Sequence, residues 1–162
     1  MINTGIVTVS DARLTGWLVV SNSGNVLFTN WSAIITASRD VIVTTNGTIT
    51  VVGPFTDSQM SNRIYLVCSN LTVDPGGQIN ANYKGYASAN NANGFGPGKG
   101  LTAGGGAGHG GRGGTSSFSG NPFADYGGGT NGSVNAPSQP GSGGAGQANA
   151  GFGGSGGGVI RI

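Results

Sequence analysis

A ten-residue pattern that occurs three times in the first half of the chain constrains its fold more than any other feature of the sequence. The copies are residues 18–27, 41–50 and 71–80, and they begin 23 and 30 residues apart. Each copy has apolar residues at its first, third and ninth positions and a polar turn that closes on glycine at its seventh. The pattern predicts two short strands joined by a tight corner, repeated with connections of varying length.

Other segments of this half also have the composition of β-strands. They are short, rich in Val, Ile, Thr and aromatic residues, and separated by Asn, Gly, Ser, Asp or Pro. None shows the 3.6-residue period of a helix, so we expect an all-β protein. The predicted strands are 6–9, 17–20, 25–28, 33–36, 41–44, 48–51 and 64–67.

Two arrangements accommodate such a repeat. In a parallel β-solenoid, which resembles a β-helix, like residues of successive coils lie about 4.8 Å apart, and apolar ladders fill the interior. Glycine would then occupy the corner where a positive φ is needed. In a sandwich of antiparallel hairpins, a turn such as Thr45-Asn46-Gly47 instead joins two paired strands. The repeat favours the solenoid, and residues 1–84 are expected to form its rungs.

Glycine divides the chain into two regions. Of the 35 glycines, 7 lie in residues 1–84 and 28 in residues 85–158. The second region has too few large apolar side chains for an ordinary core, and glycine loses the most backbone entropy on ordering, so one interpretation is a flexible loop. The alternative is an ordered insertion, after which residues 159–162 return to the solenoid as a final rung strand.

The ordered alternative rests on glycines spaced three residues apart. A polyproline-II-type helix has three residues per turn, so such glycines would line one edge and let neighbouring backbones approach. We therefore expect residues 85–158 to pack as extended polyglycine-II-type strands. The glycines with this spacing are Gly105, Gly108, Gly111 and Gly114, Gly141 and Gly144, and Gly153 and Gly156.

The sequence offers few residues for catalysis or ligand coordination. Only 12 of the 162 residues are charged. The single histidine, His109, is 16 residues from Asp125, its nearest carboxylate in sequence, and so lacks a neighbour that would orient a catalytic base. The aspartates are scattered, unlike those of calcium-binding repeats, and the lone Cys68 is expected to be an inert core thiol. We expect no enzyme, no metal site and no cofactor.

Charge and hydropathy also limit the partners. The formal net charge is +2 with no cluster of Lys or Arg, and no run of about 20 apolar residues occurs. We therefore expect neither nucleic-acid binding nor membrane insertion.

The first and last predicted rungs carry no evident cap, and Arg161 is the only charge near the last one. Uncapped edge strands pair with other chains, and a head-to-tail contact between copies does not close. The expected partner is therefore the protein itself, in a homopolymeric filament. The predicted assembly edges are Ile6, Val7, Val9, Val159, Ile160 and Ile162.

Tyrosines in and near the glycine-rich region suggest an alternative function. Tyr83, Tyr86 and Tyr126 are candidates for stacking on sugar rings of surface glycans. They are the possible ligand contacts of a receptor- or glycan-binding adhesin tip.

Five stretches carry a resemblance to known proteins: Asn62–Ala81, Lys84–Tyr86, Gly108–Gly114, Pro140–Gly144 and Gly156–Ile162. Over residues 62–162 the chain resembles the glycine-rich β-solenoid modules of large secreted or surface proteins of bacteria, of fibre or adhesin type. This resemblance implies an extracellular or cell-surface scaffold without catalytic residues. The glycine-rich stretch is also similar to the polyglycine-II sandwich adhesins of phage tail fibres, whose loops bind the host receptor.

Overall fold

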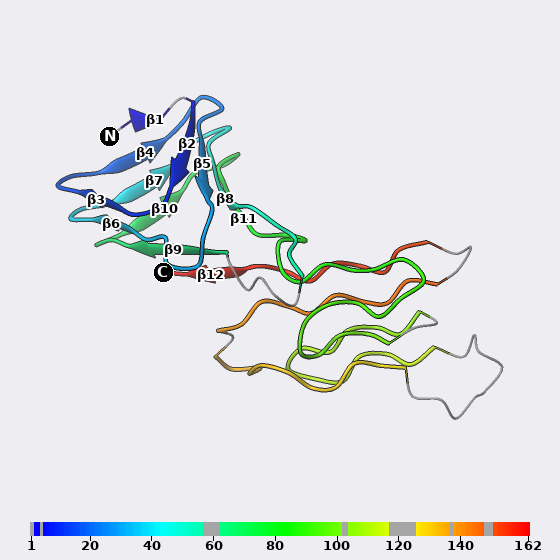
Figure 1. Ribbon diagram of the computed structural model, residues 1–162. Helices are drawn as coiled ribbons and strands as arrows, with labels where there is room; N and C mark the ends of the chain where they lie inside the picture. Colours follow the sequence, from blue (N-terminus) through cyan, green and yellow to red (C-terminus); the bar gives the residue numbers. More distant parts are fainter. Residues whose placement is uncertain are drawn as a thin grey trace. The chain divides into compact units, whose positions relative to one another are not determined.

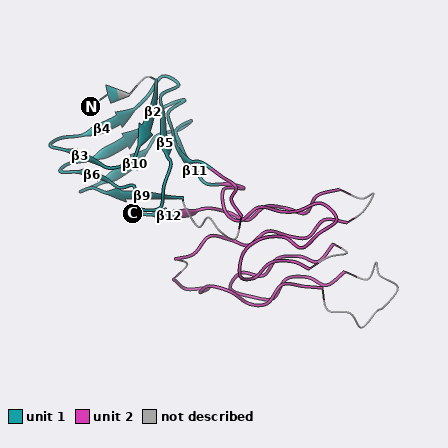
Figure 2. Ribbon diagram, viewed as in Figure 1, with its two compact units in different colours: residues 1–52, 61–81, 160–162 teal, residues 53–60, 82–159 magenta. Residues whose placement is uncertain are grey.

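The computed structural model of the chain (Figure 1) describes residues 2–3, 5–56, 62–101, 104–116, 126–136, 138–147 and 151–162. The chain divides into two compact units, coloured separately in Figure 2. Unit 1 comprises Met1–Val52, Ser61–Ala81 and Ile160–Ile162, and unit 2 comprises Gly53–Met60 and Asn82–Val159. Unit 2 thus includes the segments 53–60 and 82–84, which were expected among the rungs of residues 1–84, and Val159, which was expected in the final rung strand.

The described residues form short strands and no helix, so the prediction of an all-β protein is confirmed. The strands make three four-stranded sheets, ordered β1-β4-β7-β10 (sheet A), β11-β8-β5-β2 (sheet B) and β12-β9-β6-β3 (sheet C). Their bounds are β1 Ile2–Asn3, β2 Ile6–Val9, β3 Ala12–Leu14, β4 Leu18–Val20, β5 Asn25–Phe28, β6 Ile35–Ala37, β7 Val41–Val43, β8 Thr48–Val51, β9 Arg63–Val67, β10 Leu71–Val73, β11 Gln78–Asn80 and β12 Val159–Arg161.

The described chain passes through sheets A, B and C in the same order four times. Each pass adds one strand to each sheet, and β12 lies beside β9 in Figure 1. The pairing is parallel along sheet A, from β2 to β11 in sheet B and from β3 to β9 in sheet C. Antiparallel hairpins are therefore the wrong alternative for these strands.

The register of the sheets matches the alignment of the three sequence copies. Val43 pairs with Val20 on one side and Val73 on the other, and Ile49 pairs with Val26 and Ile79. These are the third and ninth positions of the copies, so the predicted repeat is confirmed residue by residue.

The corner within each copy forms a turn of the same kind, but the role assigned to its glycine is wrong. The N–H of the seventh residue donates to the carbonyl of the fourth at 2.8–2.9 Å in all three copies. A positive φ falls on the sixth residue of every copy, which is Ser23, Asn46 or Gly76, and in the first copy also on Asn22. Glycine is needed at Gly47 because an added Cβ would collide with the carbonyl of Val20 in the preceding pass.

The core of unit 1 follows from strict alternation along the strands. In β5 the side chains of Val26 and Phe28 are buried, whereas those of Asn25 and Leu27 are half-buried on the opposite side. Because the pairing is in register, inward residues stack into columns such as Val9, Phe28 and Val51. Burying each large side chain contributes about 1.5–3 kcal/mol.

Unit 2 packs backbone against backbone. Most of its described buried residues are glycines, and residues 142–146 form a continuous buried segment. An added Cβ at Gly143 would collide with the carbonyl oxygen of Ala87, so the two backbone segments approach more closely than a side chain would allow. The other buried residues of this unit are Phe55, Tyr86, Pro140, Ser142, Ala145 and Val159.

Consecutive N–H groups in unit 2 donate to more than two neighbouring segments. The N–H groups of Gly143, Gly144 and Ala145 donate to the carbonyls of Phe95, Gly154 and Gly105, at 2.8, 2.8 and 3.0 Å. Three consecutive residues thus bond to three different segments, whereas a β-strand alternates between two neighbours in one plane. Gly141 and Gly144 both donate to the segment 151–158, three residues apart.

The three-residue glycine spacing marks close backbone contacts only in part. Gly105 and Gly108 approach neighbouring carbonyls too closely to accept a Cβ. At Gly111 and Gly114 the packing does not require glycine, because an added Cβ would have no heavy atom within 4 Å, although the carbonyl of Gly114 accepts a hydrogen bond from Gly106 N–H at 2.9 Å. Gly110, which has a φ of +67°, lies between the pair Gly105 and Gly108 and the pair Gly111 and Gly114. The chain turns at Gly110, so the three-residue repeat of backbone contacts does not continue past it.

Candidate functional site

The sheets end together, so that unpaired strand edges gather in two sets. Strands β1, β2 and β3 of the first pass each end a sheet, and we call them the first edge set. Strands β10, β11 and β12 end the same three sheets on the other side and form the second edge set. Edge strands expose unpaired backbone N–H and C=O groups, which makes both sets candidates for strand addition.

The free backbone groups of β2 follow from its pairing. Asn25 N–H donates to Gly5 O at 2.7 Å, and Thr29 Oγ1 donates to Val9 O at 3.3 Å. Gly5 and Val9 therefore direct their carbonyls toward the second pass. Since backbone groups alternate along a strand, Ile6 and Thr8 direct theirs toward the free edge.

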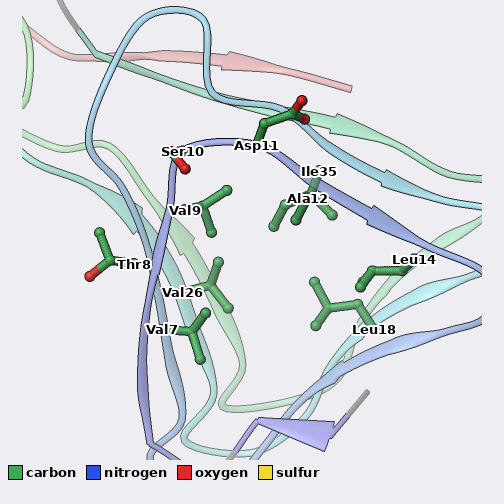
Figure 3. A pocket seen from close by; sticks show the side chains of 10 residues that line it. All are labelled: Val7, Thr8, Val9, Ser10, Asp11, Ala12, Leu14, Leu18, Val26 and Ile35. Carbon is green, nitrogen blue, oxygen red and sulfur yellow. The ribbon is translucent and has the colours of Figure 1, made fainter.

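An apolar hollow of about 90 Å³ opens beside the first edge set (Figure 3). The side chains of Val7 and Val9 point into it, while Thr8 points to the other side of β2 and the carboxylate of Asp11 points away. The interior is therefore not filled at this end. The apolar residues that line the hollow are Val7, Val9, Ala12, Leu14, Leu18, Val26 and Ile35.

The second edge set leaves interior positions uncovered as well. Val73 is 45 % exposed, whereas Val43, its register partner in the preceding pass, is fully buried. Ile79 is half-buried against the core, while its partner Ile49 is fully buried. Both edge sets therefore expose apolar interior residues. In the middle of unit 1, residues at the same positions are covered by the neighbouring pass.

The predicted assembly edges divide between the two sets. Ile6, Val7 and Val9 lie on β2, where Ile6 is 75 % exposed, Val7 is half-buried and Val9 is buried. On β12, Val159 is buried and Ile160 is exposed, and the exposed Ile162 follows the strand.

Four strands of the two edge sets, β1, β3, β10 and β11, were not predicted as assembly edges. Strand β3, Ala12–Leu14, has only three residues and a central arginine, so its composition gave no strand signal. Strands β10 and β11 were recognised as the third copy of the repeat but not as edges. Their position as the last copy was the signal that could have identified them.

The three tyrosines lie in different environments. Tyr83 is 71 % exposed and has a φ of +58°. Tyr86 is buried and packs edge-on against Phe55, with 4.9 Å between ring centroids, which counts against a ligand contact there. Tyr126 is half-buried, and its carbonyl accepts a hydrogen bond from Leu101 N–H at 2.9 Å.

Residues with potential for chemistry are dispersed. His109 is exposed in unit 2, and Cys68 is a free thiol, half-buried against the core of unit 1. In the part of the chain that the structure describes, no three His, Cys, Asp or Glu side chains gather into a metal-binding group. The same residues include no helix with the length and hydropathy needed to cross a membrane. Asp57 and Asp125 lie outside the described residues.

Comparison with known proteins identifies no relative: no protein-family model, curated protein or solved structure matches the chain.

Proposed function

We propose that this protein is a non-catalytic, extracellular or cell-surface structural subunit that polymerises head to tail by strand addition. In this proposal unit 1 is a parallel β-solenoid of three-stranded coils. The second edge set of one copy adds to the first edge set of the next. The observation that carries the proposal is the pair of uncovered edge sets, each ending all three sheets at once.

The contacts between passes of unit 1 supply the template for the joint. Continuing each sheet would pair β10 with β1, β11 with β2 and β12 with β3 of the next copy. Val73 and Ile79 would then be covered as Val43 and Ile49 are covered within one chain. Apolar burial and backbone pairing would act together, as in other complexes formed by strand addition.

Unit 2 supports a structural role in a different way. We infer that it is packed as polyglycine-II-type strands, because three consecutive N–H groups donate to three different segments, and Gly141 and Gly144, three residues apart, donate to the same segment. Such a unit consists mainly of satisfied backbone and offers few side chains for catalysis. The resemblance of residues 62–162 to modules of secreted bacterial proteins supports the extracellular location.

A proline in β2 tests the polymerisation. Thr8→Pro removes an N–H that the alternation places on the free edge, and it leaves the bonds between β2 and β5 intact. We expect the critical concentration for filament formation to rise at least about tenfold, because the facing carbonyl loses its partner. Sedimentation velocity and negative-stain electron microscopy measure this change.

Thr8→Ala is the matched control, because it removes the same side chain but keeps the N–H. It should polymerise like the unchanged protein. A stable monomer of the unchanged protein at high concentration would refute the proposal, as would filaments of Thr8→Pro that form at the same concentration as those of Thr8→Ala.

A further inference from the structure

Arginines and aromatic rings stack on one another along β9. Ile64 and Leu66 of this strand are fully buried, so Arg63 and Tyr65, which alternate with them, lie on the outer side of sheet C. The guanidinium carbon of Arg63 is 4.9 Å from the ring centroid of Trp31 and 4.7 Å from that of Tyr65. The guanidinium carbon of Arg161, on β12, is 4.6 Å from the same Tyr65 centroid. We call Trp31, Arg63, Tyr65 and Arg161 the arginine ladder.

The strands that carry the ladder contain positive charge and no carboxylate side chain. The strands of sheet C contain Arg13, Arg63 and Arg161 and no acidic residue. None of these arginines forms an ion pair with a carboxylate in the described ranges. The Nε of Arg63 is buried and has no hydrogen-bond partner among the described residues. Within the described ranges, the contacts seen for the two guanidinium groups of the ladder are those with the rings of Trp31 and Tyr65.

Stacking on rings leaves the hydrogen-bonding capacity of arginine in place. A guanidinium carries its five N–H donors in its plane, while cation–π contacts and stacking use its faces. The in-plane donors of a stacked arginine match the two oxygens of a carboxylate. Because the rings restrict Arg63 on two sides, less side-chain entropy is lost when an anion binds.

We propose that the arginine ladder binds carboxylate groups of an extended acidic polysaccharide. Arg161 and Arg63 lie on the neighbouring strands β12 and β9, so these two cations follow the direction in which the strands stack. Arg13, on β3, lies in the register column of Thr36 and Val67, four residues along the strand from Arg63, and is not part of the ladder. A linear polymer with regularly repeated carboxylates can engage both arginines of the ladder at once. Single-stranded nucleic acid gains much of its affinity from bases stacked on free rings, and two guanidinium groups already lie over Tyr65.

The test is titration calorimetry of the full chain with an oligogalacturonate of defined length. We expect saturable binding to this probe and none to neutral dextran. Arg161→Gln and Arg63→Gln should each raise the Kd about tenfold, since a hydrogen bond between charged groups is lost. Arg112→Gln is the matched control, because it removes the same charge from unit 2, and its Kd should be unchanged.

Circular dichroism establishes that each variant is folded. If Arg63→Gln is not folded, the Kd of Arg161→Gln decides whether the ladder binds the sugar, because Arg161 is exposed on an edge strand and its substitution leaves the core intact. The proposal is overturned if oligogalacturonate does not bind or if the folded ladder variants bind it unchanged. It is also overturned if Arg112→Gln weakens binding equally, or if oligothymidylate or anionic lipid vesicles bind more tightly than the sugar. None of these outcomes depends on filament formation.

Discussion

Replacing Gly143 by alanine is expected to destabilise unit 2 by about 3 kcal/mol or more. Gly143 is buried within the segment 142–146, and its added Cβ would collide with the carbonyl oxygen of Ala87. That obstacle is backbone and cannot rotate away as a side chain would. Relieving the clash would separate two segments and strain the bond from Gly143 N–H to Phe95 O. The segments around Gly143 and Ala87 are therefore expected to lose their close packing.

Hydrogen–deuterium exchange with mass spectrometry measures this effect separately in each unit. The amides of residues 94–101 and 140–147 should exchange about a hundredfold faster in Gly143→Ala, since 3 kcal/mol corresponds to that factor in the opening equilibrium. The amides of β7 and β8 in unit 1 should be unaffected.

Gly114→Ala is the matched control for this substitution. Gly114 is exposed, an added Cβ would meet no heavy atom within 4 Å, and its φ lies outside the left-handed region. Alanine there should leave the stability unchanged or raise it by about 0.4–1 kcal/mol, because it restricts the unfolded chain. Equal exchange rates in the two variants would show that unit 2 does not depend on close backbone contact.

The repeat was readable from the sequence because side-chain alternation and tight turns are local properties. Val43 and Val73 fall in the same column of sheet A because both occupy the third position of a copy. The reason that glycine is required at Gly47 could not be predicted, since it depends on the carbonyl of Val20 in the previous pass. A residue that is 27 positions distant in sequence becomes a neighbour only once the passes are stacked.

The same limit explains what was missed at the candidate sites. Trp31 lies in the connection between β5 and β6, whereas Arg63 begins β9, so their contact follows from the pairing of β6 with β9 in sheet C rather than from any motif. In unit 2, the spacing of Gly141 and Gly144 correctly indicated a three-residue repeat of backbone bonds. For Gly111 and Gly114 the same spacing was uninformative, because nothing in the sequence distinguishes a packed glycine from one beside a turn.

Replacing Phe28 by alanine is expected to destabilise unit 1 by about 3–5 kcal/mol. Phe28 is fully buried, and it lies in register between Val9 and Val51, so truncation leaves a cavity that the paired strands cannot close. Urea unfolding followed by the fluorescence of Trp17 and Trp31, both in unit 1, measures the change.

Leu27→Ala provides the control for Phe28→Ala within the same strand. Leu27 points to the opposite side of β5 and is half-buried, so its truncation should cost about 1 kcal/mol or less. The contrast between adjacent residues isolates the interior column from strand propensity, since both variants place alanine in β5. If the two substitutions cost the same, the interior of unit 1 is not the closed apolar stack that the register implies, and the edge sets would no longer present matching cross-sections for a second copy.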